Sequence, residues 1–138
     1  KVFFNYIEPL LGLMGTRINR IGNYGSGMMV KVLNNFIAAS SVVSVRHVLH
    51  HAQKFELDIG ALFKTIDTSS GQTWFGTNRA DIEWFKENFE NDNTMGILKK
   101  DVEAYVDSFE NESDLDNFVS GELSTAIIKA LNNMPVTK

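Results

Sequence analysis

The longest helical pattern in the chain runs from Ser26 to about Phe55. It contains no proline, and no glycine after its first turn, and apolar residues follow one helix face at positions 29, 32, 33, 36 and 43. A helix of this length extends over roughly 45 Å, at about 1.5 Å per residue. Its middle, residues 38–45, consists of small and β-branched side chains that let a second helix approach closely, and a strand over Val42–Val45 is the alternative. We therefore expect one long helix, buried inside a larger assembly, at the centre of the fold.

The rest of the chain also favours helices, apart from one short stretch. Residues 16–21 alternate between polar and apolar side chains, which is typical of a strand, although a lone strand has no sheet to join. Apolar spacing and capping residues predict further helices over residues 1–14, 58–68, 72–77, 79–89, 95–109 and, starting at Ser113 or Asp114, up to 134. Pro9 lies inside the first, which either begins near Ile7 or is kinked. The predicted fold class is all-α, a helical bundle around the long helix with a short N-terminal helix–strand segment.

Two of these helices have clear capping signals at their predicted starts. Asp58 precedes an apolar run and can accept a hydrogen bond from a backbone N–H of the first turn. Asn78, with Asp81 three residues later, has the form of a capping box for the helix over 79–89.

Composition and charge exclude several classes of protein. The chain has no cysteine, which excludes disulfides and thiolate zinc sites and favours a reducing, cytoplasmic location. No apolar run approaches the roughly 18–20 residues of a membrane span, so we expect no membrane partner. Residues 1–54 carry six Lys or Arg and one Glu, whereas residues 55–138 carry seven Lys or Arg and sixteen Asp or Glu. The acidic second half argues against a nucleic-acid partner, and the basic first part suits a small anion.

Three glycines precede the long helix, in the sequence Gly22-Asn23-Tyr24-Gly25-Ser26-Gly27. Glycines permit tight turns and close approach to a ligand, and the start of a helix offers unpaired N–H groups. Lys31 and Asn35 are four residues apart, on one face of the helix that follows. The stretch is not a Walker A loop, because no Gly-Lys-Ser/Thr follows, and it is not a dinucleotide fingerprint, because Val30 occupies the third glycine position. It favours a site for an anionic, oxygen-rich molecule, with a purely structural glycine turn as the alternative.

The pattern Gly-x-x-Gly-x-Gly-x-x-x-Lys-x-x-Asn-Asn resembles the β-hydroxyacid dehydrogenase family, that of 3-hydroxyisobutyrate dehydrogenase and its 6-phosphogluconate dehydrogenase relatives. The residues that carry it are Gly22, Gly25, Gly27, Lys31, Asn34 and Asn35. A second stretch, Ile97–Val102, resembles the family's Leu-x-Lys-Asp-Leu helix and aligns Lys100, with Lys99 as the alternative. Asn34 stands where the 6-phosphogluconate dehydrogenases have histidine, which favours the branch that acts on small hydroxyacids.

The resemblance implies a domain organisation and an activity. Residues 1–22 would be the tail end of a truncated Rossmann domain, and residues 23–138 a helical C-terminal domain like that of 6-phosphogluconate dehydrogenase. The full-length enzyme would use NAD or NADP, bound mainly by the missing Rossmann domain, to interconvert a small β-hydroxyacid and its semialdehyde or keto form. This part alone would be inactive. The family also implies a homodimer or homotetramer, and a non-catalytic helical module for oligomerisation or binding is the alternative.

The same resemblance implies roles for individual residues. Lys31 would be the general acid/base that takes the proton of the substrate hydroxyl, and Lys100 would contact the cofactor. The residues implied in substrate binding are Asn35, Asn34, Gly25, Ser26 and Gly27.

The chain departs from the family pattern on the long helix, where Arg46-His47 replaces a common glutamate. His47, His50 and His51 are spaced so that they could present nitrogens to a metal, but no further ligand accompanies them. We therefore interpret them as a polar helix face and predict no metal site.

Overall fold

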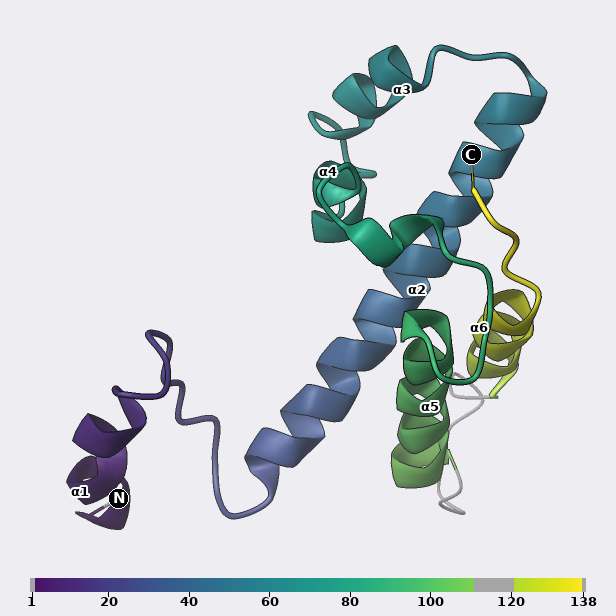
Figure 1. Cartoon of the computed structure of the whole chain (residues 1–138). Helices are drawn as coiled ribbons and strands as arrows, with labels where there is room; N and C mark the ends of the chain where they lie inside the picture. The colour runs from purple at the N-terminus through teal and green to yellow at the C-terminus, as the bar shows by residue number, and fades with distance from the viewer. Residues whose placement is uncertain (1, 111–120, 138) are drawn as a thin grey trace. The chain divides into compact units, whose positions relative to one another are not determined.

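The computed structural model describes residues 2–110 and 121–137 (Figure 1). This part of the chain is helical and contains no strand, so the predicted all-α class is confirmed. The chain divides into two compact units, Lys1–Lys31 and Val32–Lys138. The division falls inside the long helix α2 (Ser26–Lys54), and the domain boundary expected after residue 22 remains a prediction.

The first unit holds α1 (Val2–Leu11), an irregular segment and the start of α2. Pro9 lies inside α1, so the alternative that this helix begins near Ile7 is wrong. The strand expected over residues 16–21 is also wrong, because these residues have no regular secondary structure. A strand needs a neighbour to pair its N–H and C=O groups, and the described part of this unit provides no such neighbour.

The second unit packs around the C-terminal half of α2. This helix is continuous, which excludes the alternative of a strand over Val42–Val45. Its buried positions recur every three or four residues, as one helix face requires; they are Ala39, Val42, Val45, Arg46, Leu49 and Ala52. Around them lie α3 (Ile59–Ile66), α4 (Trp74–Asn78), the 3-10 helix η1 (Glu83–Lys86), α5 (Thr94–Tyr105) and α6 (Glu122–Asn132).

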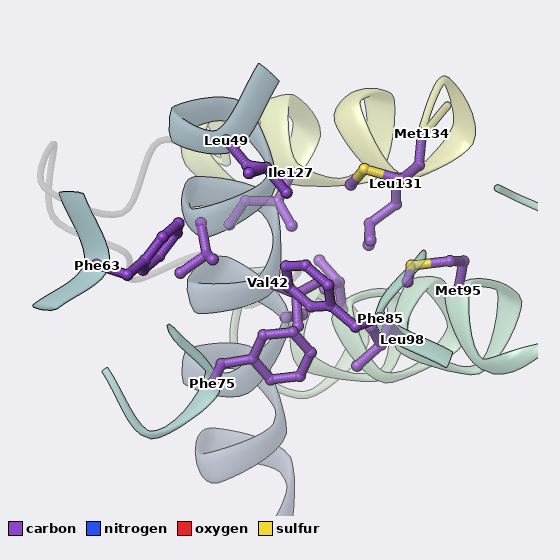
Figure 2. Packing of buried hydrophobic residues seen from close by; sticks show 13 residues of the cluster. Val42, Leu49, Phe63, Phe75, Phe85, Met95, Leu98, Ile127, Leu131 and Met134 are labelled. Atoms are coloured by element: carbon purple, nitrogen blue, oxygen red, sulfur yellow. The ribbon is translucent and has the colours of Figure 1, made fainter. Parts of the chain in front are cut away.

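The hydrophobic core joins all of these elements. Figure 2 shows Phe63, Phe75 and Phe85 around the middle of α2, with Leu131 and Met95 contributed from the side of α6 and α5. All five side chains are less than 5% exposed. The core therefore fixes the C-terminal half of α2 against α3, α4, η1, α5 and α6.

Several further contacts hold the C-terminal helices in place. The rings of Phe36 on α2 and Tyr105 on α5 are stacked, with centroids 3.9 Å apart. α5 packs against α6 and continues into a π-helix, Val106–Glu110. After α6, the chain returns along η1: the Phe89 N–H donates to the Met134 carbonyl at 3.1 Å, and the Thr137 N–H donates to the Lys86 carbonyl at 3.0 Å.

Side-chain caps begin three of the helices. The Asp58 carboxylate accepts from the Ala61 N–H at 3.0 Å, which confirms the predicted cap of α3. The Thr73 hydroxyl caps α4, and the Asn93 side chain caps α5. These residues explain why the helices begin where they do.

Two predicted helices differ from the structure. The helix expected over 79–89 is instead a turn, the short η1 and an extended segment. Its expected cap, Asn78, ends α4 and donates to the Trp74 carbonyl at 2.7 Å. The last helix begins at Glu122, because Gly121 has a φ of 70°, in the left-handed region that interrupts a helix. The start predicted at Ser113 or Asp114 lies outside the described residues.

By length and composition alone, α2 could cross a membrane, with a mean hydropathy of 1.5 in its most apolar stretch. This finding corrects the expectation that the chain contains no segment of that kind. It is weak evidence for a membrane location, because the core helix of a soluble protein passes the same test.

Candidate functional site

The glycine stretch forms the turn that starts α2. Gly25 has a φ of 88°, a conformation that only glycine adopts without strain, and its carbonyl accepts from the N–H groups of Met28 and Met29 at 3.0 and 3.2 Å. A Cβ at Gly22 would lie 2.6 Å from the Ser26 hydroxyl. Gly25 is therefore explained by its backbone conformation, and Gly22 by its close approach to the Ser26 side chain.

Gly27 is different, because nothing lies within 4 Å of the position that its Cβ would occupy. It is the second residue of α2, where alanine would favour the helix by up to about 1 kcal/mol. The described residues therefore give no packing reason for glycine at this position. A bare backbone at the start of a helix leaves room for a ligand to approach.

The predicted polar residues follow on α2. Lys31 is exposed, and no ion pair to it occurs among the described residues. Asn35 is half-buried and Asn34 is exposed, and the Asn34 amide donates to the Asn35 amide oxygen at 3.5 Å. Because α2 is continuous, Lys31 and Asn35 are one helical turn apart.

On α5, the structure distinguishes the two candidate lysines. The Lys99 ammonium forms an ion pair with Glu103 one turn later. Lys100 is exposed, and no hydrogen bond or ion pair joins it to another residue in the described part of the chain. Lys100 is therefore the lysine that is available to a ligand, although no described contact brings it to Asn34 or Asn35.

A groove next to Asn34 was not predicted from the sequence. Its volume is about 640 Å³, and its lining includes Asn34, Ser41, Thr73, Trp74 and Trp84. Trp74 is 71% exposed. The sequence contained a partial signal, because residues 34, 38 and 41 lie on one helix face and combine an amide with small side chains.

Arg46 was noted only as a departure from the family pattern, yet it is the one charged side chain of the described residues that is fully buried, at 4% exposure. Its guanidinium donates to the backbone carbonyls of Phe85, Glu87 and Pro135. Burial lowers the pKa of Arg46 from its usual value. Arg46 therefore ties α2 to η1 and to the segment after α6.

The three histidines near Arg46 do not form a metal centre in the structure. His47 and His50 line a cavity beside Arg46, whereas His51 does not line it. Among the residues with described positions, no group of three or more His, Cys, Asp or Glu is arranged to hold a metal ion.

Comparison with known proteins identifies relatives of the chain. Residues 25–134 match the family described as "NAD-binding of NADP-dependent 3-hydroxyisobutyrate dehydrogenase". A mitochondrial 3-hydroxyisobutyrate dehydrogenase of Drosophila melanogaster is 31% identical over 71 residues, which cover 51% of this chain and 22% of the relative. The human protein of the same name is also 31% identical over 71 residues, covering 51% of this chain and 21% of the relative.

A third relative is an uncharacterized oxidoreductase of Bacillus subtilis, YkwC, 31% identical over 90 residues that cover 65% of this chain and 31% of the relative. No solved structure matches the chain. The matched segments thus span between a fifth and a third of these relatives' lengths. Since the family match extends over most of the chain and includes Lys31, Asn34, Asn35 and Lys100, the chain belongs to the 3-hydroxyisobutyrate dehydrogenase family of β-hydroxyacid dehydrogenases.

Proposed function

We propose that this chain is the substrate-binding helical part of an NAD- or NADP-dependent dehydrogenase that interconverts a small β-hydroxyacid and its semialdehyde or keto form. The observation that carries the proposal is the start of α2, where an unpacked Gly27 is followed by an exposed Lys31 and by two adjoining asparagine amides. Family membership supports the coarser statement of a nicotinamide-dependent dehydrogenase.

Each residue has a role that its chemistry can perform. In the oxidation direction, the uncharged Lys31 amine accepts the proton of the substrate hydroxyl; in the reverse direction, the ammonium returns it to the carbonyl oxygen. Asn35 donates a hydrogen bond to a substrate oxygen without adding charge, and Asn34 orients the Asn35 amide. Gly25, Ser26 and Gly27 let the substrate approach the backbone at the start of the helix.

A nicotinamide cofactor, when bound, would supply the hydride-acceptor chemistry of this reaction. Lys100 fits an anionic group of that cofactor, because its ammonium is exposed and has no ion-pair partner among the described residues. Lys99 does not fit this role, since Glu103 already neutralises it. We propose that the cofactor is held mainly by a Rossmann domain of which residues 1–22 are the tail end.

The test of Lys31 compares two substitutions in the intact enzyme. Lys31→Ala removes the amine, and Lys31→Arg keeps the positive charge but cannot lose its proton. Both variants are expected to lose hydride transfer by at least about a hundredfold, the scale of general acid–base catalysis. Lys64→Ala, which removes another exposed lysine from α3, is the matched control and is expected to be fully active. Turnover of either Lys31 variant within about tenfold of the unmodified enzyme would overturn the assignment.

The second candidate is a non-catalytic helical module of the same ancestry, used for oligomerisation or binding. The N-terminal half of α2 favours association, because Met28, Leu33 and Ile37 are 64%, 43% and 65% exposed. We propose that the protein is an enzyme and also forms a homodimer or homotetramer. The interface of this assembly covers these side chains. Sedimentation that shows only monomer at high concentration would contradict the assembly. The absence of a Gly-x-Gly-x-x-Gly motif after a strand upstream of residue 1 would favour the non-catalytic module.

The expected cytoplasmic location, and the expected absence of membrane and nucleic-acid partners, remain predictions.

A further inference from the structure

A second cavity lies along the C-terminal part of α2. Its volume is about 280 Å³, and it is lined on one side by Arg46, His47, His50 and Gln53 of α2. The opposite wall is formed by Ala130 and by residues 133–137, at and beyond the end of α6. None of the lining residues is acidic. Arg46 is eleven positions after Asn35, which is about 16 Å along a helix.

The charge of Arg46 is buried without a negative partner. Its three hydrogen bonds go to neutral backbone carbonyls, and they use three of the five N–H donors of a guanidinium. No carboxylate forms an ion pair with Arg46 in the part of the chain that the structure describes. Buried charges in proteins are normally paired, because an isolated one loses its hydration. The cavity wall thus carries a positive charge that has no ion-pair partner among the described residues.

Neighbouring groups can complete a site for a negative charge. His50 is four residues after Arg46 and Gln53 seven, so all three lie on one face of α2. The Nδ1 atom of His47 is 2.9 Å from the Val43 carbonyl, which only accepts, so Nδ1 carries a proton and Nε2 can donate to an anion in the imidazolium form. Imidazolium and amide N–H groups donate to oxyanions in the same way as the guanidinium.

The carbonyl groups at the C-terminal end of α2 do not neutralise the charge of Arg46. The N–H groups of Phe55, Glu56 and Leu57 already donate to the carbonyls of His51, Gln53 and Ala52. The negative end of the α2 dipole is therefore largely satisfied within the chain, and its field falls off within the last turn. Glu87 supplies one of the backbone carbonyls that Arg46 contacts, and one oxygen of its carboxylate is buried without a hydrogen-bond partner, but Glu87 forms no ion pair with Arg46 and does not line the cavity.

We propose that this cavity binds a small oxyanion, the phosphate or carboxylate group of a small molecule, through Arg46 with His47, His50 and Gln53. The site is separate from the candidate substrate residues and does not depend on the proposed dehydrogenase activity. A ligand here would contact α2, α6 and the C-terminal segment together.

The experiment is a titration of the intact protein with inorganic phosphate and, separately, with acetate, followed by calorimetry and by the histidine ring signals in NMR spectra. Saturable binding is expected for at least one anion, and the tighter one identifies the source of the oxyanion. The double variant His47→Ala/His50→Ala is expected to weaken binding by about tenfold or more, since it removes two imidazole side chains from the cavity wall. His51→Ala is the matched control, because His51 is exposed on the same helix but does not line the cavity.

The variants leave Arg46 in place, so the fold should be retained, and an unchanged circular dichroism spectrum checks this. Absence of saturable binding of both anions to the unmodified protein would overturn the proposal. An equal loss of affinity in the His51→Ala control would also overturn it, because the effect would then not come from the cavity.

Discussion

The close contacts around Gly96 lead to a specific prediction about the stability of the protein. It is the third residue of α5, a place where alanine would normally stabilise a helix by about 1 kcal/mol. A Cβ at Gly96, however, would lie 2.5 Å from the Glu90 carbonyl oxygen and still closer to that of Asn91. Real Cβ atoms essentially never approach this closely, so the backbone would have to move.

The atoms that would have to move are held by the cap of α5. The Asn93 side-chain oxygen accepts from the N–H groups of Met95 and Glu90 at 3.0 and 3.3 Å, and its amide donates to the Asn88 carbonyl at 2.8 Å. Overpacking costs about 1–3 kcal/mol, and a disturbed cap costs about 1 kcal/mol. After subtraction of the gain in helix propensity, Gly96→Ala is expected to lower the free energy of unfolding by about 2 kcal/mol.

Gly27→Ala is the matched control, because Gly27 is also in the first turn of a helix but has open space around its Cβ position. It is expected to leave the free energy of unfolding unchanged or to raise it by up to about 1 kcal/mol. Urea unfolding followed by circular dichroism measures both variants, and an unchanged m-value shows that the denatured state is the same. Equal free energies of unfolding of the two variants would refute the argument that backbone contact, and not helix propensity, determines the effect of the Gly96 substitution on stability.

Two further predictions concern single contacts. Arg46→Met removes the hydrogen bonds that tie α2 to three carbonyls and leaves those carbonyls unpaired, so the free energy of unfolding should fall by about 3 kcal/mol in the same urea assay; an unchanged midpoint would show that these contacts do not hold the fold. Asp58→Ala removes the cap of α3 and should cost about 1 kcal/mol, whereas Asp58→Asn, which can cap equally well, should cost almost nothing; equal losses in both variants would implicate the charge of Asp58 and not its cap.

The features that the sequence predicted correctly are those with local causes. α2 follows from a continuous stretch without helix breakers, and the start of α3 follows from the Asp58 carboxylate and the N–H group three residues later. Both can be recognised from neighbouring residues, because the groups that interact are separated by one helical turn.

The features that were missed depend on distant partners. η1 replaces a predicted helix because Arg46 binds the carbonyls of Phe85 and Glu87, and because Phe89 pairs with Met134 of the C-terminal segment. The strand over 16–21 failed for the opposite reason, since its alternating pattern has no partner in the described unit. The spacing of residues along the sequence does not show whether a distant hydrogen-bond partner or a neighbouring strand is present.

The candidate site divides in the same way. Lys31, Asn35 and Lys100 are predicted because they stand in patterns that resemble the family's, while the choice of Lys100 over Lys99 gained support only from the ion pair of Lys99 with Glu103. The cavity beside Arg46 could not be predicted, because its second wall is the segment after α6, about eighty-five residues further along the chain than His50, as the position of its lining residues shows.

The division of α2 into a packed and an unpacked half separates stability from function. Val42 in the packed half is 0% exposed, and truncation of such a side chain costs about 2 kcal/mol through lost burial and the cavity that remains. Lys31 and Asn34 in the other half are exposed, and substitution of exposed residues changes stability by about 0.5 kcal/mol or less. A variant at these two positions that loses activity, while keeping the free energy of unfolding and the assembly state of the unmodified protein, would therefore do so through the chemistry of the side chain. This separation makes the start of α2 a place where kinetic measurements can be read directly as statements about the site.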